Sequence, residues 1–385
     1  MPKSPPVSPR LTFVTHEFHP RIGGAATVVT ELAAACSKIG WEVTVLAPGE
    51  TSAADSAYPF KLVRMGHRGK QDWLARFALL RFMRRRGIGD SEHLVIAEPA
   101  ALRALLYEPL FRIPGFSRPT VILHGTEILR FSFPPYRKAL FRRLLDRSEK
   151  IHVLSSYNAK LLDETFPNLS TPVVVAPGGP SIAQPPDLSV GIKGKDHPDK
   201  VIILTVGRIH PRKGQLEALL ALSRLPTEDQ KLIHYRIVGP SVRSKYREKL
   251  LDVASRCHFP VEFTGPVSEE QMAAEYQQAD IFALTSKQSR KSIEGFGLVY
   301  LDASASSLPI VATRSGGIPE AVEDEVTGLL AAENDVEGLT ERFRRLIHSP
   351  TLRQELGTNG KRMAFSQSWT NCALAIWGES TRFSD

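Results

Sequence analysis

Short apolar runs recur along the chain, and stretches with helical character separate them. β-branched residues are frequent in these runs and turn-forming residues stand at their ends, a combination that is typical of strands. Near-continuous apolar strands that alternate with helices predict parallel sheets covered on both faces, and hence an α/β protein. The expected strands cover residues 11–18, 41–48, 93–99, 120–127, 150–156 and 171–177, followed by 201–208, 234–240, 261–267, 281–286 and 309–315.

The strand pattern stops once and then begins again. Residues 178–200 are rich in Gly, Pro and Lys and lack periodicity, so we expect a linker over residues 179–198. Two α/β units in tandem predict two Rossmann-like domains with a central cleft, the first over residues 1–178 and the second over residues 199–365. Ligands of this architecture bind at the carboxyl ends of the strands.

The net charge of +8 lies entirely in the first half of the chain. Residues 61–150 hold 19 basic and 8 acidic residues, whereas residues 200–385 hold 23 of each kind. A basic domain joined to a neutral one suggests different partners for the two, and an anionic membrane surface is a candidate for the basic one. No recognised nucleic-acid-binding motif accompanies the charge, so we expect no nucleic acid partner.

Cysteine usage and hydropathy bear on the cellular compartment. Cys36, Cys257 and Cys372 are far apart and form no CxxC pair, which argues against a disulfide framework or a cysteine metal site. No apolar run approaches the length needed to span a bilayer, and the N-terminus lacks the apolar core of a signal peptide. We therefore expect a cytoplasmic protein.

The stretch TVGRIHPRKGQLEALLAL, residues 205–222, reads as a strand, a turn and a helix. Arg208 leaves the end of the strand, and Lys213 and Gly214 stand where the helix begins. Free N–H groups at a helix start, together with two cations, suit a phosphate or a diphosphate. A solvated loop with ordinary surface cations is the alternative. The chain has neither a GxxxxGK[ST] loop nor a GxGxxG motif, which disfavours P-loop and dinucleotide redox chemistry.

A second stretch, KSIEGFGLVYLDAS at residues 291–304, carries two carboxylates around a pair of glycines. A helix that begins at the glycines places Glu294 just before its N-terminus and Asp302 about two turns along it. An anionic or hydroxyl-rich ligand fits such an arrangement. For Asp302, a plain surface charge is the alternative.

Together, these motifs resemble the retaining glycosyltransferases of family 4, which have the GT-B fold. The order of Arg208, Lys213, Glu294 and Asp302 carries the resemblance, and five further segments fit it. These segments are EFHPRIGGAATVVTELA (17–33), LHGTE (123–127), LSSYNAKLL (154–162), FTGPVSEE (263–270) and TRSGGIPEAV (313–322). The GT-B fold implies that the final segment, residues 366–385, returns to the N-terminal domain.

The resemblance implies a site for a nucleotide-diphosphate sugar. Arg208 and Lys213 would bind the donor diphosphate and neutralise charge as the sugar leaves. Glu294 would accept hydrogen bonds from sugar hydroxyls, and Asp302 would hold the ribose, where the family usually carries the longer Glu. The chain has no D-x-D motif, so we expect catalysis without a metal or any other cofactor. The family retains the anomeric configuration by front-face substitution.

The remaining site residues come from the same resemblance. His124, at the end of a strand, would touch the donor sugar near the reacting carbon; a buried structural histidine is the alternative. His16 and Glu17 are expected to line the acceptor side. Further donor contacts are expected from Gly23, Gly24, Gly239, Gly265, Gly295, Phe296 and Gly297, the last three from a first helical turn.

Two basic segments, residues 73–86 and 136–147, are candidates for a membrane contact. On a helical wheel, the second places its apolar residues on one arc and its cations on the other, which predicts a helix packed on its own sheet with a solvated basic face. The first is apolar nearly all round, with cations interspersed. For this segment, membrane contact and packing within the protein both stay open.

We therefore expect a hexosyltransferase that moves a hexose from a nucleotide-diphosphate sugar to a hydroxyl of a lipid or saccharide acceptor. The loop TSKQSRKSIEGFG at residues 285–297 resembles that of mannosyltransferases acting on lipids, which favours GDP-mannose as donor over UDP-glucose. A GT-B sugar-nucleotide 2-epimerase and a non-catalytic lipid- or sugar-binding module are the alternatives.

Overall fold

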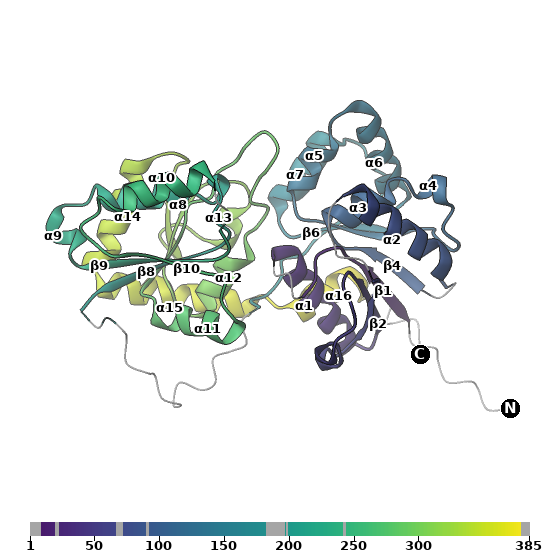
Figure 1. Ribbon diagram of the computed structural model, residues 1–385, viewed down its shortest axis with the longest axis horizontal. Helices are drawn as coiled ribbons and strands as arrows, with labels where there is room; N and C mark the ends of the chain where they lie inside the picture. The colour runs from purple at the N-terminus through teal and green to yellow at the C-terminus, as the bar shows by residue number, and fades with distance from the viewer. Residues whose placement is uncertain are drawn as a thin grey trace. The chain divides into compact units, whose positions relative to one another are not determined.

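A computed structural model describes residues 9–19, 23–66, 72–89, 92–181, 197, 199–241 and 244–378. The chain divides into two compact units, each built on one parallel sheet covered by helices (Figure 1). Unit 1 comprises residues 1–178 and 368–385, and unit 2 comprises residues 179–367. The predicted α/β class with two parallel sheets is confirmed. Most of the expected linker, residues 182–196 and 198, lies outside the described residues.

Unit 1 contains a seven-stranded sheet with the order β3-β2-β1-β4-β5-β6-β7, in which every pairing is parallel. Its strands are β1 (Arg10–Val14), β2 (Glu42–Ala47), β3 (Lys61–Arg64), β4 (Glu92–Ile96), β5 (Thr120–Leu123), β6 (Lys150–Val153) and β7 (Val173–Val175). Its helices are α1 (Gly24–Lys38), α2 (Trp73–Arg86), α3 (Pro99–Leu105), α4 (Glu108–Phe111), α5 (Thr126–Phe131), α6 (Pro135–Arg147), α7 (Ser156–Thr165) and α16 (Trp369–Trp377).

The two faces of the unit 1 sheet carry different helices (Figure 1). On one face, α16 packs on α1, and Trp377 meets Phe13 of β1 edge to face, with ring centroids 6.0 Å apart. On the other face, apolar residues of α2, α3, α5 and α6 share one core with the strands. The last described helix of the chain therefore belongs to unit 1.

Unit 2 contains a six-stranded parallel sheet with the order β10-β9-β8-β11-β12-β13. Its strands are β8 (Val201–Val206), β9 (Ile233–Val238), β10 (Val261–Gly265), β11 (Ile281–Leu284), β12 (Ile310–Thr313) and β13 (Gly328–Ala331). Its helices are α8 (Gln215–Ser223), α9 (Thr227–Gln230), α10 (Lys245–Ala254), α11 (Glu269–Gln278), α12 (Leu298–Ala305), α13 (Ile318–Ala321), α14 (Val336–His348) and α15 (Pro350–Ser366). Both sheets have the doubly wound order in which the strand sequence reverses next to the first strand.

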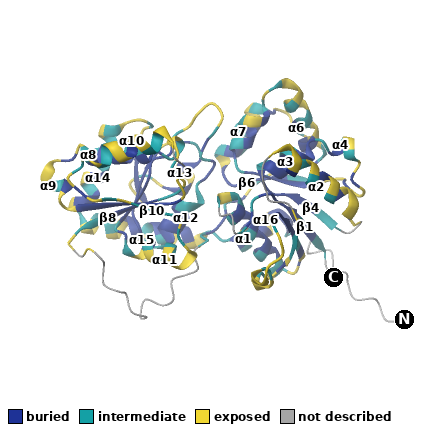
Figure 2. Cartoon of the chain, viewed as in Figure 1, coloured by how far each residue is buried: buried dark blue, intermediate teal, exposed yellow. Residues whose placement is uncertain are grey.

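The central strands of both sheets are buried, whereas the edge strands β3, β7 and β10 and the outer faces of the helices are partly or fully exposed (Figure 2). Each expected strand forms, but several expected runs extend past the point where the strand ends. β1 ends at Val14 and β5 at Leu123, so His16 and His124 lie in the loops that follow. None of the described helices is long and apolar enough to cross a membrane.

Candidate active site

In unit 2, a short turn after β8 positions Lys213. A single 3₁₀ turn, η2 (Pro211–Lys213), ends at Gly214, which is the N-cap of α8. Gly214 has φ +72°, and a Cβ there would lie 1.9 Å from the carbonyl oxygen of Thr285. The Thr285 hydroxyl also donates to the Gly214 carbonyl at 2.7 Å. This close approach requires glycine, and it brings Lys213 beside the end of β11.

Glu294 connects the loop before α12 to this turn. Its Oε2 accepts from Lys213 Nζ at 2.8 Å, from Arg212 Nη1 at 2.6 Å and from the Ser286 hydroxyl at 3.2 Å. All three charged side chains are largely buried. The structure therefore brings together Lys213 and Glu294, which are 81 residues apart in sequence.

The charges in this cluster do not cancel. Burial raises the pKa of Glu294, but Lys213 and Arg212 outweigh it and lower that pKa to about 2, so the carboxylate is ionised. Burial also lowers the pKa of Lys213, and the facing Glu294 opposes that effect. One carboxylate faces two cations, so the group retains positive charge and can attract an anion such as a diphosphate.

Arg208 is not hydrogen-bonded to this group, although its charge contributes to lowering the pKa of Lys213. It follows β8 and is exposed, and its guanidinium makes no hydrogen bond or ion pair within the described part of the chain. Its carbonyl accepts from the Gln215 side chain at 2.9 Å, which holds the backbone against the start of α8. A guanidinium on a fixed backbone is available to bind phosphate oxygens.

The glycine-rich loop before α12 differs from the expectation. The helix begins at Leu298, and Gly297 is its N-cap with φ +85°. Gly295 and Phe296 therefore precede the helix and are not in its first turn, because the left-handed residue at 297 ends the loop. Phe296 is buried, so only its backbone could face a ligand.

Gly239 and Gly265 lie next to each other at the carboxyl edge of the unit 2 sheet. Gly265 ends β10 and Gly239 follows β9. The Gly239 N–H donates to the Gly265 carbonyl at 2.9 Å, so the two strand ends are joined by their backbones. This is the edge at which ligands of doubly wound sheets bind.

Asp302 lies in the second turn of α12, as expected, but its carboxylate already has a partner. Oδ1 accepts from the Ser181 N–H at 2.7 Å, and the Ser181 hydroxyl lies 3.0 Å from both carboxylate oxygens. The side chain is 9% exposed, so Asp302 is not a solvated surface charge. A ligand that binds this carboxylate would have to bind it together with Ser181 or displace Ser181.

In unit 1, His124 lies in the turn between β5 and α5. Its Nε2 lies 3.0 Å from the carbonyl oxygen of Ala97, at the end of β4, and this contact fixes the ring. Its backbone N–H donates to the carboxylate of Glu127. Because Nε2 donates to a carbonyl, the neutral ring would leave Nδ1 as the acceptor. His124 is half-buried at the carboxyl edge of its sheet, a position that a ligand can reach.

His16 does not have the exposed position expected of an acceptor contact. It is 3% exposed, its Nδ1 lies 3.8 Å from Glu98, and burial lowers its pKa to about 4. Glu98 is itself buried and accepts from the N–H groups of His16 at 2.8 Å, Ala100 at 2.7 Å and Ala101 at 2.7 Å. The ring of His16 is thus enclosed beneath the surface, and its backbone is tied to the start of α3.

Glu17 packs against the start of α1. A Cβ on Gly23 would lie 1.7 Å from Oε1 of Glu17, so only glycine leaves room for this carboxylate. Gly23 is the N-cap of α1, and Gly24 is its first residue, with open space where a Cβ would be. Glu17 and the two glycines therefore lie together at the carboxyl edge of β1.

Four residues with contacts in these sites were not predicted from the sequence: Arg212, Ser286, Glu98 and Ser181. Arg212 stands next to Lys213 in the same basic turn, so the sequence did offer it as a second candidate cation. Glu98 precedes a proline, which is common at the first position of a helix, so the start of α3 had a signal in the sequence although the role of Glu98 did not. The partners Ser286 and Ser181 carry no local signal, because only the folding of distant segments brings them to their carboxylates.

Comparison with known proteins agrees with this architecture. The Glycosyltransferase Family 4 model matches residues 22–183, and the Glycosyl transferases group 1 model matches residues 192–363. Among solved structures, Anabaena HepE in complex with UDP and glucose superimposes with a TM-score of 0.76 at 16% identity, over 97% of this chain and 99% of that one. The lipopolysaccharide-biosynthesis glycosyltransferase WaaG has a TM-score of 0.68 at 16% identity, over 96% and 100% of the two chains.

Several relatives with higher sequence identity than these structures are mannosyltransferases. A GDP-mannose-dependent alpha-(1-6)-phosphatidylinositol monomannoside mannosyltransferase of Mycolicibacterium smegmatis is 27% identical over 363 residues, 92% of this chain and 93% of the relative. A GDP-mannose-dependent monoacylated alpha-(1-6)-phosphatidylinositol monomannoside mannosyltransferase of Corynebacterium glutamicum is 28% identical over 364 residues, which is 90% of this chain and 91% of the relative. The relatives do not favour an epimerase.

The chain has two parallel-sheet units, and a glycosyltransferase family model matches most of each, so the protein is a glycosyltransferase of the GT-B fold. Because the two family models together cover most of the chain, it belongs to glycosyltransferase family 4.

Proposed function

We propose that the protein transfers mannose from GDP-mannose to a hydroxyl of a lipid or saccharide acceptor, with retention of the anomeric configuration. The observation that carries the proposal is the buried group of Lys213, Arg212 and Glu294, which retains positive charge at the ligand-binding edge of unit 2. The donor named for the mycobacterial and corynebacterial relatives supports the choice of GDP-mannose.

In this proposal, unit 2 binds the donor. Lys213 and Arg208 contact the diphosphate, and Glu294 accepts from sugar hydroxyls through the oxygen that its cations leave free. The backbone at residues 295–297 approaches the sugar, Gly239 and Gly265 flank the base, and Asp302 holds the ribose. In unit 1, His124 contacts the donor sugar near the reacting carbon. Gly23 and Gly24 allow close approach of the ligand, and Glu17 contacts the acceptor.

We further propose that transfer needs no metal or other cofactor. A leaving nucleoside diphosphate must be stabilised without a proton, and cationic side chains can supply that stabilisation. The sequence has no D-x-D motif to hold a metal on the diphosphate. Turnover that persists in excess chelator supports this proposal, whereas complete loss that Mg²⁺ or Mn²⁺ restores contradicts it.

The donor is tested by ligand-dependent thermal stability. A ligand that binds only the folded state raises the melting temperature by mass action. We expect GDP and GDP-mannose to raise it more than UDP and UDP-glucose, and Lys213→Ala to lose most of the effect. An equal or larger response to UDP-glucose would move the donor assignment to that sugar nucleotide.

We also propose that unit 1 contacts the inner face of the membrane, as a cytoplasmic peripheral protein does. α2 and α4 pack together, and Phe77 meets Phe111 edge to face at 5.8 Å. Large apolar side chains nevertheless stay exposed on these helices: Trp73 is 70% exposed and Leu110 is 78% exposed. Such side chains with cations nearby are typical of surfaces that bind anionic lipid.

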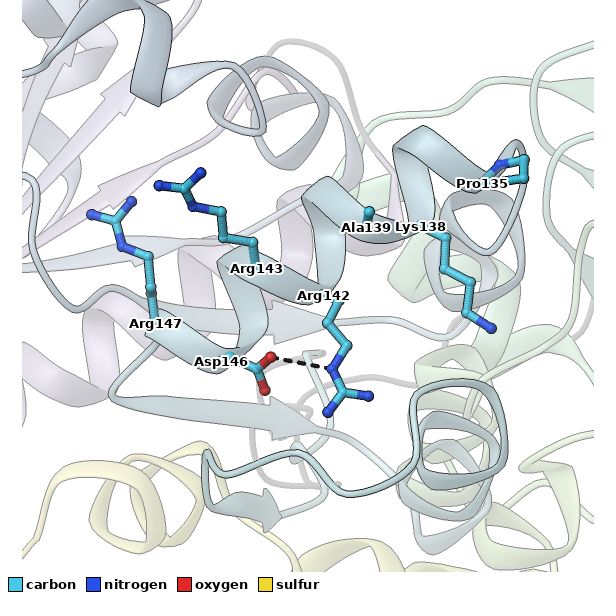
Figure 3. A pocket seen from close by; sticks show the side chains of 7 residues that line it. All are labelled: Pro135, Lys138, Ala139, Arg142, Arg143, Asp146 and Arg147. Carbon is cyan, nitrogen blue, oxygen red and sulfur yellow. Dashed lines mark hydrogen bonds and ion pairs between the residues drawn. The ribbon is translucent and has the colours of Figure 1, made fainter.

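The second basic helix, α6, is less suited to this role. Phe141, Leu144 and Leu145 are buried in the unit 1 core, as the helical wheel predicts. Its cations line an open hollow with Pro135 and Ala139 (Figure 3). One of them, Arg142, is bonded to Asp146 and to the carbonyls of residues 167 and 168. We therefore assign the principal membrane contact to α2 and α4.

A further inference from the structure

Arg212 joins the turn before α8 to both ends of the loop that carries Glu294. Its backbone carbonyl accepts from the N–H of Lys287, at the start of this loop, at 2.9 Å. Its Nη1 donates to the Ile293 carbonyl at 3.4 Å and to Oε2 of Glu294 at 2.6 Å, at the end of the loop. Arg212 therefore holds residues 287–294 at two points, although it has no assigned role in donor binding.

The backbone of Glu294 is held in place without Arg212. The Gly317 N–H, just before α13, donates to the Glu294 carbonyl at 3.0 Å. Gly316 has φ +57°, and a Cβ there would lie 2.3 Å from the same carbonyl oxygen, so glycine is required for this approach. Because the backbone is fixed, the position of the carboxylate depends on its side-chain torsions and on the donors that select among them.

The two oxygens of the Glu294 carboxylate have different surroundings. Oε2 accepts from Lys213, Arg212 and Ser286, and the contact with Arg212 is the shortest of the three. Oε1 accepts no hydrogen bond from the described part of the chain. Three donors on one oxygen fix the orientation of the carboxylate and leave the other oxygen for a hydroxyl of a ligand.

Arg212 also affects how much of the Lys213 charge stays available. Burial raises the pKa of Glu294, but Lys213 and Arg212 together hold it at about 2, so the carboxylate is ionised and shared between two cations. An ammonium group has three N–H donors, and among the described residues Lys213 spends one of them on Glu294. The other two remain for an anion.

We propose that Arg212 is a positioning residue: it turns the Glu294 carboxylate so that Oε1 meets a hydroxyl of the donor sugar, and it does not itself contact the donor. This inference rests on the proposed function and deepens it, since it explains how the sugar contact of that site is placed. Loss of Arg212 should therefore affect recognition of the sugar more than recognition of the nucleotide.

Binding of GDP and of GDP-mannose, measured by titration calorimetry, separates these two parts of the donor. Arg212→Gln should weaken binding of GDP-mannose about tenfold more than it weakens binding of GDP, the scale of one hydrogen bond to a charged group. Arg212→Lys should restore most of this difference, because an ammonium group can donate to the same two acceptors. The matched control is Arg224→Gln, which removes an exposed cation at the end of α8 and should change neither affinity.

A double-mutant cycle with Glu294 tests whether Arg212 acts through the carboxylate. Glu294→Gln alone should show the same selective loss for GDP-mannose. Adding Arg212→Gln to Glu294→Gln should then leave the difference between the two probes unchanged, because a positioning residue has nothing left to position.

Three results would overturn the inference. Additive losses in the cycle would mean that Arg212 contacts the sugar itself, and equal weakening of GDP and GDP-mannose would make it a diphosphate ligand. A lower melting temperature of the free protein, with the difference between the probes as in the wild type, would make it a purely structural residue.

The proposed function fails by a different result. If the wild type binds UDP-glucose in place of GDP-mannose, the donor assignment is wrong, and the same cycle is run with UDP and UDP-glucose. A selective and non-additive loss with that pair would still support the role of Arg212. If the wild type binds neither sugar nucleotide, both the proposed function and this inference are rejected.

Discussion

In unit 2, Nζ of Lys213 lies 2.8 Å from Oε2 of Glu294, and both side chains are largely buried. A buried pair of this kind is stable when further hydrogen bonds satisfy its charges, and here Arg212 and Ser286 supply them. The consequence is a fixed ammonium group whose charge is only partly neutralised. It is available to stabilise negative charge that develops on a leaving group.

Lys213→Ala should therefore lower kcat by about 100-fold, the scale of losing one preorganised electrostatic contact in a transition state. The fold should persist, because Arg212 still pairs with Glu294 at 2.6 Å. Steady-state kinetics with saturating donor measure the effect. Lys231→Ala is the matched control, since that lysine is exposed and pairs only with Glu228 at the surface. A kcat near that of the control would exclude Lys213 from the diphosphate site.

Asp302→Ala should raise the KM for the donor and leave kcat nearly unchanged, because a contact with ribose is shared by ground state and transition state. Asp302→Glu should stay folded and active, as the family's usual residue. Ser181→Ala removes the hydroxyl contact at 3.0 Å but keeps the backbone one, and it should leave the donor KM unchanged or lower it. If Asp302→Ala and Ser181→Ala reduced only thermal stability, the carboxylate would serve to anchor Ser181.

Stability should fall as the pH drops from about 6.5 to about 4, because burial lowers the pKa of both His16 and His152 to about 4. Both rings stay mostly neutral in the folded protein until the pH approaches 4, whereas the unfolded chain begins to bind protons near the ordinary pKa of 6.5. The contribution of these two neutral rings to the free energy of unfolding is therefore complete above pH 6.5, the pKa in the unfolded chain. It is lost as the pH falls toward 4, the pKa in the folded protein.

Denaturant unfolding across this pH window measures the effect. His152 Nε2 contacts the Ala176 carbonyl at 2.8 Å, and an amide can replace that contact without titrating. His152→Gln should consequently show a smaller loss of free energy of unfolding than the wild type. The same pH dependence in both proteins would rule out His152 as a source.

Removing the exposed apolar side chains of α2 should weaken binding to anionic vesicles. Burying a large apolar side chain contributes about 1.5–3 kcal/mol, so Trp73→Ser combined with Phe77→Ser should reduce partitioning at least tenfold. Vesicle co-sedimentation measures it. The matched control is Leu251→Ser, which alters an exposed leucine of unit 2. Equal partitioning of the two variants would contradict a membrane contact through α2.

The fold was predictable because its sheets are parallel and buried. Strands covered on both faces are apolar throughout, so β8 and β12 stand out in the sequence. The strands that escaped detection are β3 and β13. β3 is a short edge strand with Lys61 and Arg64 in it, and β13 is a four-residue strand that starts at a glycine. Neither shows a β-branched run of the kind that marks the central strands.

Residues of the candidate site were predictable from the sequence where they belong to a recognisable local motif. Lys213 and Glu294 stand in turns with their own sequence signals, and the structure joins them. The burial of His16 and the contact between Ser181 and Asp302 were not predictable, because they depend on which distant segments pack together.

Product analysis shows directly whether the protein transfers mannose from GDP-mannose. Purified protein is incubated with GDP-mannose and a polar lipid extract or soluble saccharides, and the products are identified by mass spectrometry. We expect acceptor-dependent release of GDP and one added hexose on an acceptor, and we expect Lys213→Ala to lose both. Mannose transfer is contradicted if GDP-mannose stays intact while UDP-glucose is consumed, or if the only product is an epimerised sugar with no glycosylated acceptor.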